Sequence, residues 1–233
     1  MMVSKGAEDI NIRMPEDARD TGNYVPTFNA YLTAIVRDSK GKIIEVRRQK
    51  SHSPTANFIG LFLPTSFFST NNTSFTITNA TGGTCSYSPA LSNTAYDIPY
   101  PSSDVNYQVY IVMIQVGSGQ QSNPFSAYSL AAPIANGSGG GQLVYQSVVP
   151  PSQIMLNGNT AYFYITQTFN NLSGSTITIT EAGIFLNLTL AIYNTTGKTS
   201  CGNILVWYDV FSPSISVPNG GSVTIYYTFT INP

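Results

Sequence analysis

Apolar and polar residues alternate over short segments of this chain, most regularly near its C-terminal end. From Val223 to Ile231 an apolar residue stands at every second position, with three threonines and one tyrosine between them. A period of two is typical of a β-strand with one buried face. No segment has a convincing helical period, so the sequence predicts an all-β protein.

Other segments rich in Tyr, Ile, Val and Thr predict further strands. Tyr31–Arg37 and Lys42–Arg48 flank the turn Asp38–Gly41 and predict a hairpin. With Val223–Ile231 and the segments below, this makes about nine strands separated by Gly, Pro, Asn and Ser, which is typical of a sandwich or jelly roll. The additional segments are Ser74–Thr78, Tyr107–Val116, Gln142–Val149, Ala161–Phe169, Thr176–Leu186 and Ile204–Phe211.

The predicted domain organisation is an N-terminal arm followed by one sandwich. Residues 1–23 are polar and charged without a hydrophobic period, which predicts an arm that becomes ordered on a neighbour. Residues 24–233 are predicted to form a single jelly-roll-like antiparallel β-sandwich, although the glycine-rich stretch at 137–141 leaves a domain boundary conceivable. The apolar segment Asn57–Leu63, ended by Pro64, is predicted to form one or two helical turns that pack on the core.

Charge is scarce and unevenly placed. Charged residues make up 9% of the chain, and residues 1–50 contain nine of the ten Lys and Arg residues and seven of the eleven Asp and Glu residues. We therefore expect a surface largely covered by neighbouring chains or glycans, and no nucleic-acid-binding body. The first residues include no apolar stretch suited to a secretory signal, and no apolar run reaches membrane-span length, so we expect a soluble protein without a transmembrane segment.

Groups suited to catalysis are few. The chain has one histidine, His52, in a polar loop context, and Thr196–Thr199 lacks the earlier glycine of a phosphate-binding loop. Glu181 and Asp209 are the only carboxylates in neighbouring predicted strands, and bonding to backbone groups at strand ends explains them better than glycoside hydrolysis. We expect no enzyme activity, no metal and no cofactor.

Three other sets of residues are candidate sites. Cys85 and Cys201 stand in turn-like contexts, where a disulfide and two free thiols are equally compatible with the sequence. Five basic residues of the predicted hairpin form a possible contact patch for an acidic neighbour, lipid or nucleic acid, with a solvated face as the default interpretation. They are Lys40, Lys42, Arg47, Arg48 and Lys50. Possible N-glycosylation sequons occur at Asn71, Asn72, Asn79, Asn136, Asn171, Asn187 and Asn194.

Several strand and turn segments, from both the first third and the rest of the chain, carry a resemblance to a known group of proteins. These segments are Arg37–Ile44, Ser51–Ser53, Asn57–Ile59, Tyr128–Ile134, Gly139–Tyr145, Phe169–Asn171, Ile177–Phe185, Asp209–Ser212 and Val217–Thr228. Together they resemble structural proteins of viruses that infect thermophilic archaea, and are similar to some structural proteins of tailed phages. Tyr208 departs from the pattern, which has a basic residue before the position of Asp209.

The resemblance implies a jelly-roll-like virion protein at a vertex, turret, spike or tail attachment, usually in a ring of identical copies. We expect a homo-oligomer that contacts other virion proteins and is assembled in the host cytoplasm. The alternative is a carbohydrate- or receptor-binding module of a spike or fibre, in which exposed tyrosines and Trp207 stack on a host glycan.

Overall fold

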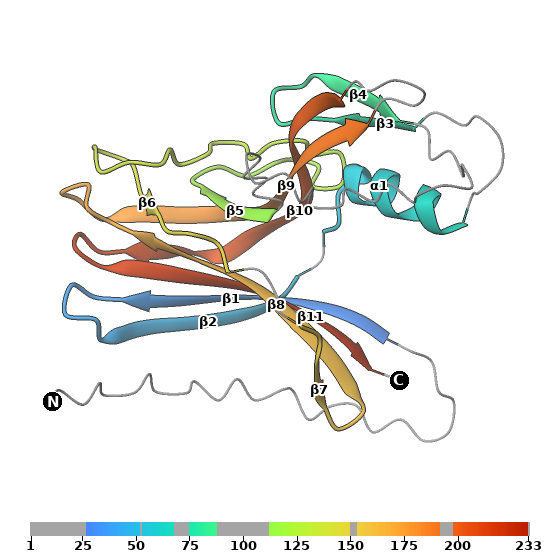
Figure 1. The fold of residues 1–233 in the computed structure, drawn as a ribbon. Helices are drawn as coiled ribbons and strands as arrows, with labels where there is room; N and C mark the ends of the chain where they lie inside the picture. Colours follow the sequence, from blue (N-terminus) through green and yellow to red (C-terminus); the bar gives the residue numbers. More distant parts are fainter. Residues whose placement is uncertain are drawn as a thin grey trace, which may run out of the picture.

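A computed structural model of the chain describes residues 27–51, 53–67, 75–87, 112–149, 153–191 and 198–232. Antiparallel strands form two sheets that face each other, with a two-stranded hairpin and one helix at one end (Figure 1). The prediction of an all-β, antiparallel protein is confirmed.

The larger sheet, sheet A, has six strands in the order β2-β1-β11-β8-β6, with β7 also paired to β8. The first and last described strands therefore lie side by side at its centre, and strands on both sides of the 137–141 glycines share this sheet. The strands are β1 (Thr27–Arg37), β2 (Ile43–Ser51), β6 (Val144–Tyr145), β7 (Met155–Asn157), β8 (Thr160–Asn170) and β11 (Ser222–Asn232).

The inner face of sheet A is packed by matching small and large side chains across β1 and β11. Ala30 is the partner of Phe229, and Ala34 is the partner of Ile225. All four side chains belong to the main hydrophobic core. This pairing fills the space between the sheets evenly, as close packing requires.

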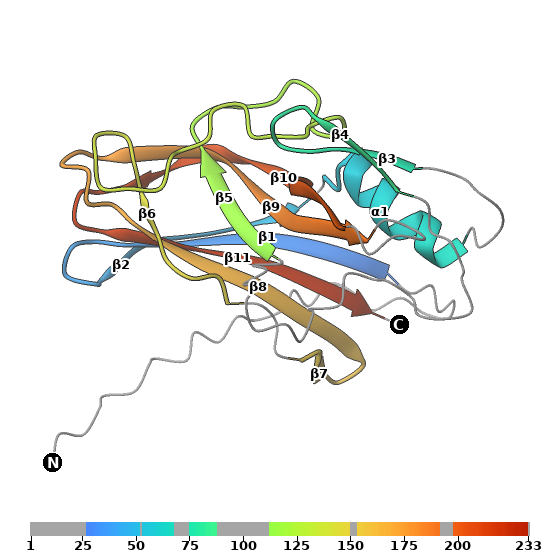
Figure 2. The ribbon, with the colours of Figure 1, turned by 45° about the horizontal axis from the view of Figure 1, so that its top comes forward.

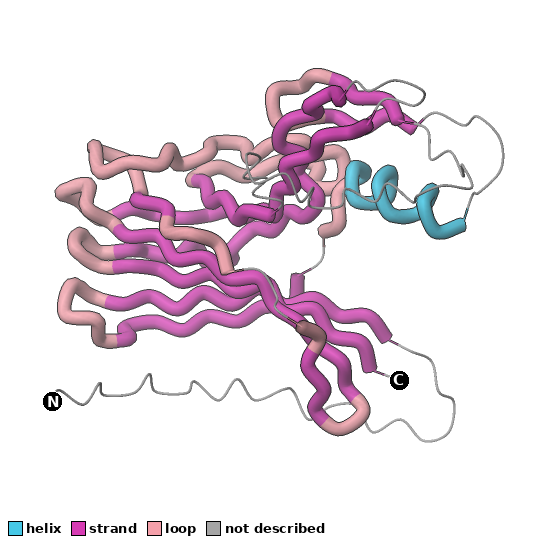
Figure 3. The backbone as a smooth tube through the Cα atoms, in the orientation of Figure 1, coloured by secondary structure: helices cyan, strands magenta, loops and turns pink. Residues whose placement is uncertain are grey.

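The smaller sheet, sheet B, has the order β10-β9-β5, from β5 (Val112–Gly117), β9 (Ile177–Ala191) and β10 (Lys198–Val217). One face packs on sheet A. The other is covered by the long loop after β5, shown in pink above the sandwich in Figure 3, which contributes Ala127 and Leu130 to a second hydrophobic cluster. Residues 181–185 of β9 are all buried because both faces of this sheet are covered.

Side chains close the gap between the sheets on both sides. On one side, the Gln49 side chain of β2 donates to the Val210 carbonyl of β10 at 2.7 Å. On the other, Gln167 of β8 accepts a 2.8 Å bond from the backbone N–H of Ile114 in β5. These amides satisfy backbone groups at the free edges of sheet B, which would otherwise be buried without partners.

Helix α1 (Ala56–Phe67) and the hairpin of β3 (Phe75–Thr78) and β4 (Thr84–Tyr87) lie together at one end of the sandwich (Figure 2). Asn57 links the three parts: its amide bonds both backbone groups of Thr78 and the Leu205 carbonyl of β10. The prediction that Pro64 ends the helix is wrong, because α1 continues to Phe67. Contacts with β3 and β10 stabilise this helix, which is longer than the one or two turns that the sequence predicts.

The predicted strands have counterparts with shifted ends. The predicted 204–211 strand runs from 198 to 217, whereas 142–149 reduces to β6 and two isolated bridges, Leu143 to Asn136 and Val149 to Thr166. The short strands β4 and β7 were not predicted, and residues 107–111 of a predicted strand lie outside the described residues, as does the predicted arm, 1–23.

Candidate functional site

Glu181 accepts four hydrogen bonds through its two carboxylate oxygens. It is fully buried in β9, under the loop that covers sheet B. One carboxylate oxygen accepts bonds from the backbone N–H groups of Ala132 at 2.8 Å and Gly119 at 3.2 Å. The other accepts bonds from the N–H of Ala131 and the Tyr208 hydroxyl, both at 2.9 Å. Four donors hold this carboxylate as an anchor for the loop.

Two glycines at the start of the loop allow this close approach. A Cβ atom on Gly117 would lie 2.3 Å from Oε1 of Glu181, and one on Gly119 would lie 2.8 Å from the Ala132 nitrogen. Neither position has room for a side chain, so the pair of glycines is the sequence signal for this anchor, which our sequence analysis missed. It indicated only that Glu181 bonds backbone groups.

Tyr208 connects Glu181 to a second point on the loop. Its hydroxyl accepts a 2.7 Å bond from the Gln121 N–H and donates to Glu181. Burial raises the pKa of Tyr208 well above its ordinary value, and the adjacent Glu181 carboxylate raises it further. The residue that departs from the resemblance is therefore part of the core, where it stays a neutral donor.

Asp209 is also buried, but within the main core. It accepts a 2.5 Å bond from the Ser51 hydroxyl, which in turn accepts a bond from the indole N–H of Trp207. The Tyr227 hydroxyl of β11 lies near the same carboxylate. Burial, and then the negative charge of Asp209, raise the pKa of Tyr227 well above its ordinary value.

The two carboxylates lie on opposite faces of sheet B. Glu181 bonds the covering loop, whereas Asp209 bonds Ser51 of sheet A, on the other side. A glycosidase needs both groups flanking one bond of the substrate. Glu181 and Asp209 therefore do not form such a pair.

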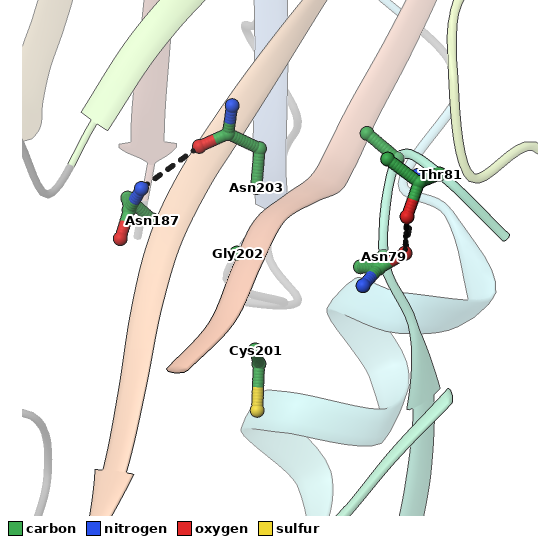
Figure 4. Close-up of a pocket in the computed structure, with 7 residues that line it drawn as sticks. Asn79, Thr81, Asn187, Cys201, Gly202 and Asn203 are labelled. Atoms are coloured by element: carbon green, nitrogen blue, oxygen red, sulfur yellow. Dashed lines mark hydrogen bonds between the residues drawn. The ribbon is translucent and has the colours of Figure 1, made fainter. Parts of the chain in front are cut away.

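Cys85 of β4 and Cys201 of β10 are joined by a disulfide, with 5.8 Å between their Cα atoms. It fastens the β3–β4 hairpin to the long β9–β10 hairpin. A shallow pocket of about 380 Å³ lies beside it, lined by Asn79 and Thr81 of the small hairpin and by Asn187, Cys201, Gly202 and Asn203 (Figure 4). The lining is neutral and contains no aromatic ring, so it offers hydrogen bonds but no stacking platform.

The described sequons differ in their surroundings. Asn136 is exposed, whereas Asn79 and Asn187 are half-buried at the pocket. Asn171 is fully buried, and its amide donates to the Ser175 and Val217 carbonyls, both at 2.8 Å. Among the possible sequons, Asn171 is therefore not accessible in the folded protein, because its amide nitrogen is enclosed and bonded. Asn71, Asn72 and Asn194 lie outside the described residues, as does His52.

The basic residues of the hairpin do not share one face. Arg47 points toward β10, where its guanidinium bonds the Pro213 and Ser214 carbonyls, and it also pairs with Glu45. Arg48 points to the other side, with its guanidinium carbon 4.4 Å from the centre of the Tyr31 ring. Lys40, Lys42 and Lys50 are exposed. Alternation along β2 divides the expected patch, and Arg47 serves to hold the two sheets together.

Trp207 is buried, with 4% of its surface exposed, and packs edge-on against Phe58 and Phe229. The expectation that it stacks on a sugar is wrong. Tyrosines instead line the outer face of sheet A, the face turned away from sheet B. There Tyr31 and Tyr164 lie on either side of Thr228, and the Tyr164 and Tyr226 ring centres are 6.0 Å apart.

Exposed apolar side chains occur in several separate places. Ile44 and Val46 lie on the edge strand β2, Phe125 and Tyr128 lie on the loop over sheet B, and Leu172 follows β8. A further group lies at the end of sheet A where β1 begins and β11 ends: Phe28, Ile154, Leu156 and Ile231. Exposed apolar side chains that lie together, as at this end of sheet A, mark candidate contact surfaces, whereas single ones are common on any protein surface.

No family model matches this chain, and neither the curated proteins nor the solved structures contain a match to it.

Within the described residues, no group of three or more His, Cys, Asp or Glu side chains is arranged to hold a metal ion. The helical part of the described chain has no segment long and apolar enough to cross a bilayer.

Proposed function

We propose that this protein is a structural subunit of a virus particle that assembles with identical copies and with other virion proteins, without catalysis. The observation that carries the proposal is the exposure of large apolar side chains on separate faces of the sandwich. A binding module for one ligand needs one such surface, whereas a subunit inside a shell or ring meets neighbours on several sides.

The distribution of charge supports the same proposal. The 183 residues after residue 50 contain only Lys198, Asp97, Asp104, Glu181 and Asp209 as charged residues. Of these, Glu181 and Asp209 are buried, so they add no charge to the surface. A free monomer normally carries more surface charge to stay soluble, whereas surfaces that contact neighbours need less.

The disulfide and the fold are compatible with a virion protein. Disulfides persist in oxidising surroundings and in proteins of hyperthermophiles, which suits an extracellular particle or a thermophilic host. The pairing of the first strand with the last supports a jelly-roll-like assignment, although β9 and β10 are consecutive strands of one sheet. We place assembly in the host cytoplasm and the final location in the virion.

The test is the mass of the purified protein in solution, measured by light scattering for the whole chain and for a chain lacking residues 1–23. We expect a defined multimer that dissociates more readily without the first 23 residues. A whole chain that remains a monomer at the highest concentration reached would contradict the proposal.

A second candidate function is glycan binding by a spike or fibre, supported by the tyrosines on the outer face of sheet A. Tyr164 is partly exposed, and the neighbouring Tyr226 ring extends the surface. Flat aromatic side chains suit stacking on sugar rings. Specific binding to a glycan array that is lost in a Tyr164→Ala variant would favour this function over assembly alone.

A further inference from the structure

One group of exposed apolar residues forms an ordered row rather than a scatter. Phe28 of β1 is the Cα partner of Ile231 in β11, Ile231 is the partner of Ala161 in β8, and Ala161 is the partner of Leu156 in β7. Residues paired in this way across a sheet point to the same face. We call this row, from Phe28 to Leu156 across four strands, the open end of sheet A.

The open end continues the inner face of the sandwich to where sheet B no longer covers it fully. The next row inward contains Phe229 and Phe163, whose rings stack with centroids 5.0 Å apart. Phe229 is covered by Trp207, whereas Phe28, Ile231 and Leu156 are 54%, 49% and 77% exposed. Figure 1 shows β9 and β10 of sheet B curving away from the ends of β1, β8 and β11, with the C-terminus at this end.

The row is supported from behind by a rigid aromatic cluster. Phe28 lies 6.0 Å from Phe229 and 6.5 Å from Trp207, measured between ring centroids. Because these rings already pack on the core, they lose little conformational freedom when a partner covers them. Preformed apolar and aromatic surfaces of this kind contribute most of the energy of protein interfaces.

Charge decides what kind of partner fits. The segments that form the open end, residues 27–30, 153–164 and 228–232, contain no charged residue. A charged partner would bury its charge here without an ion pair, at a high cost. The same surface on a second copy would bury only apolar side chains, so the open end is complementary to itself.

The point where the chain enters β1 is compatible with a second copy as the partner. Residues 1–26 enter β1 at Thr27, the neighbour of Phe28 and the Cα partner of Asn232. The preceding chain therefore joins the sandwich at the edge of the same surface.

We propose that the open end of sheet A is a contact surface between two copies of this chain, which meet through the row Phe28, Ile231, Ala161 and Leu156. The inference rests on the proposed function, since it names the surface through which the subunit assembles. The same patch on both copies makes a symmetric, two-fold contact.

The test compares Leu156→Glu with Leu172→Glu in the full chain. Both leucines are exposed, at 77% and 56%, but Leu172 lies beyond the opposite end of β8 from the open end. Neither substitution removes a core contact, and melting curves check that both variants fold. Light scattering and sedimentation then give the dissociation constant of self-association.

We expect Leu156→Glu to weaken self-association about tenfold or more and Leu172→Glu to leave this contact unchanged. A Leu156→Lys variant should also dissociate, and mixing it with Leu156→Glu should restore association between unlike copies. If Leu156→Glu keeps the wild-type mass and dissociation constant, the open end is not the contact, while assembly through another surface stands. A wild-type chain that never associates would instead contradict the proposed function.

Discussion

The Tyr208 hydroxyl of β10 donates a 2.9 Å hydrogen bond to the Glu181 carboxylate of β9, at a position where the resemblance led us to expect a basic residue. A cation there would neutralise Glu181, but tyrosine leaves the charge in place and adds one donor to three backbone N–H groups. The carboxylate is thus satisfied by hydrogen bonds alone, and the loop over sheet B depends on it.

Replacing Glu181 should destabilise the protein. Glu181→Ala leaves three backbone N–H groups and the Tyr208 hydroxyl without their acceptor, and we expect a loss of about 3 kcal/mol or more in the free energy of unfolding. Urea denaturation measures it. Glu45→Gln is the control, because Glu45 forms a partly exposed ion pair with Arg47 and should change stability by less than about 1 kcal/mol. Equal effects of the two changes would contradict the anchor role.

Alkaline pH should unfold the protein through its buried tyrosines. Burial raises the pKa of Tyr145 to about 12, and those of Tyr208 and Tyr227 are also raised. A raised pKa means that the stabilisation is complete below the unfolded-state pKa near 10 and is lost above it. Each such group should lower the free energy of unfolding by about 1.4 kcal/mol per pH unit between the two pKa values.

Urea unfolding at several pH values from neutral to strongly alkaline checks this prediction, with tyrosinate absorbance followed in parallel. We expect a flat profile up to about pH 10 and a steep decline above it. Tyr145→Phe should make the decline shallower. A protein whose tyrosines all ionise without loss of structure would disagree with their burial.

Removing the disulfide should loosen the end of the sandwich that contains α1 and the small hairpin. The bridge closes a loop with a sequence separation of 116 residues, and a native disulfide of this kind typically contributes about 2–5 kcal/mol. We expect reductant to lower the melting temperature of the wild type. A Cys85→Ala, Cys201→Ala double variant should melt at the lower temperature with or without reductant, which separates the bridge from other effects of the reagent.

Arg47 should matter to stability although it stands in a charged strand. Its guanidinium bonds the Pro213 and Ser214 carbonyls, where β10 leaves its pairing with β9. We expect Arg47→Ala to lower the free energy of unfolding by about 1–3 kcal/mol. Lys42→Ala, at an exposed position of the same hairpin, should have little effect. If both variants match the wild type in chemical denaturation, the link between β2 and β10 contributes nothing.

Asn171 should be a structural residue and not a glycan carrier. Its side chain joins the turn after β8 to Ser173, Ser175 and Val217. We expect Asn171→Ala to cost about 2–4 kcal/mol, whereas Asn136→Ala, at an exposed sequon, costs much less. Peptide mass mapping of protein from its natural source should find Asn171 unmodified, and a glycan at this position would overturn the assignment.

The strands were predictable because apolar and polar residues alternate wherever one face of a strand is covered and the other is exposed to solvent. Ile225, Tyr227 and Phe229 are inward-facing positions of this kind. The pattern fails in β9, where the loop buries both faces of residues 181–185, and in β7, which has only three residues. The residues of β9 themselves do not indicate that a loop from another part of the chain covers their second face.

The candidate sites were less predictable because residue type does not reveal direction or enclosure. Arg47 and Arg48 are adjacent and chemically identical, yet one bonds β10 and the other stacks on Tyr31. Asn136 and Asn171 both begin a sequon, yet one is exposed and the other is enclosed by its own turn. These differences come from the register of each strand and the path of each turn, which are properties of the whole fold.

The pairing of Thr27 with Asn232 has a practical consequence for any laboratory that produces this protein. An affinity tag or fluorescent fusion placed after Pro233 would follow Asn232 closely, beside Phe28 and Ile231, and would shield the surface whose contacts are to be measured. The β1–β2 turn at Ser39–Gly41 is exposed and lies at the opposite end of β1. A label inserted there would leave the row of apolar residues free. The labelled protein could then be purified, and its mass could be measured in the assembled form.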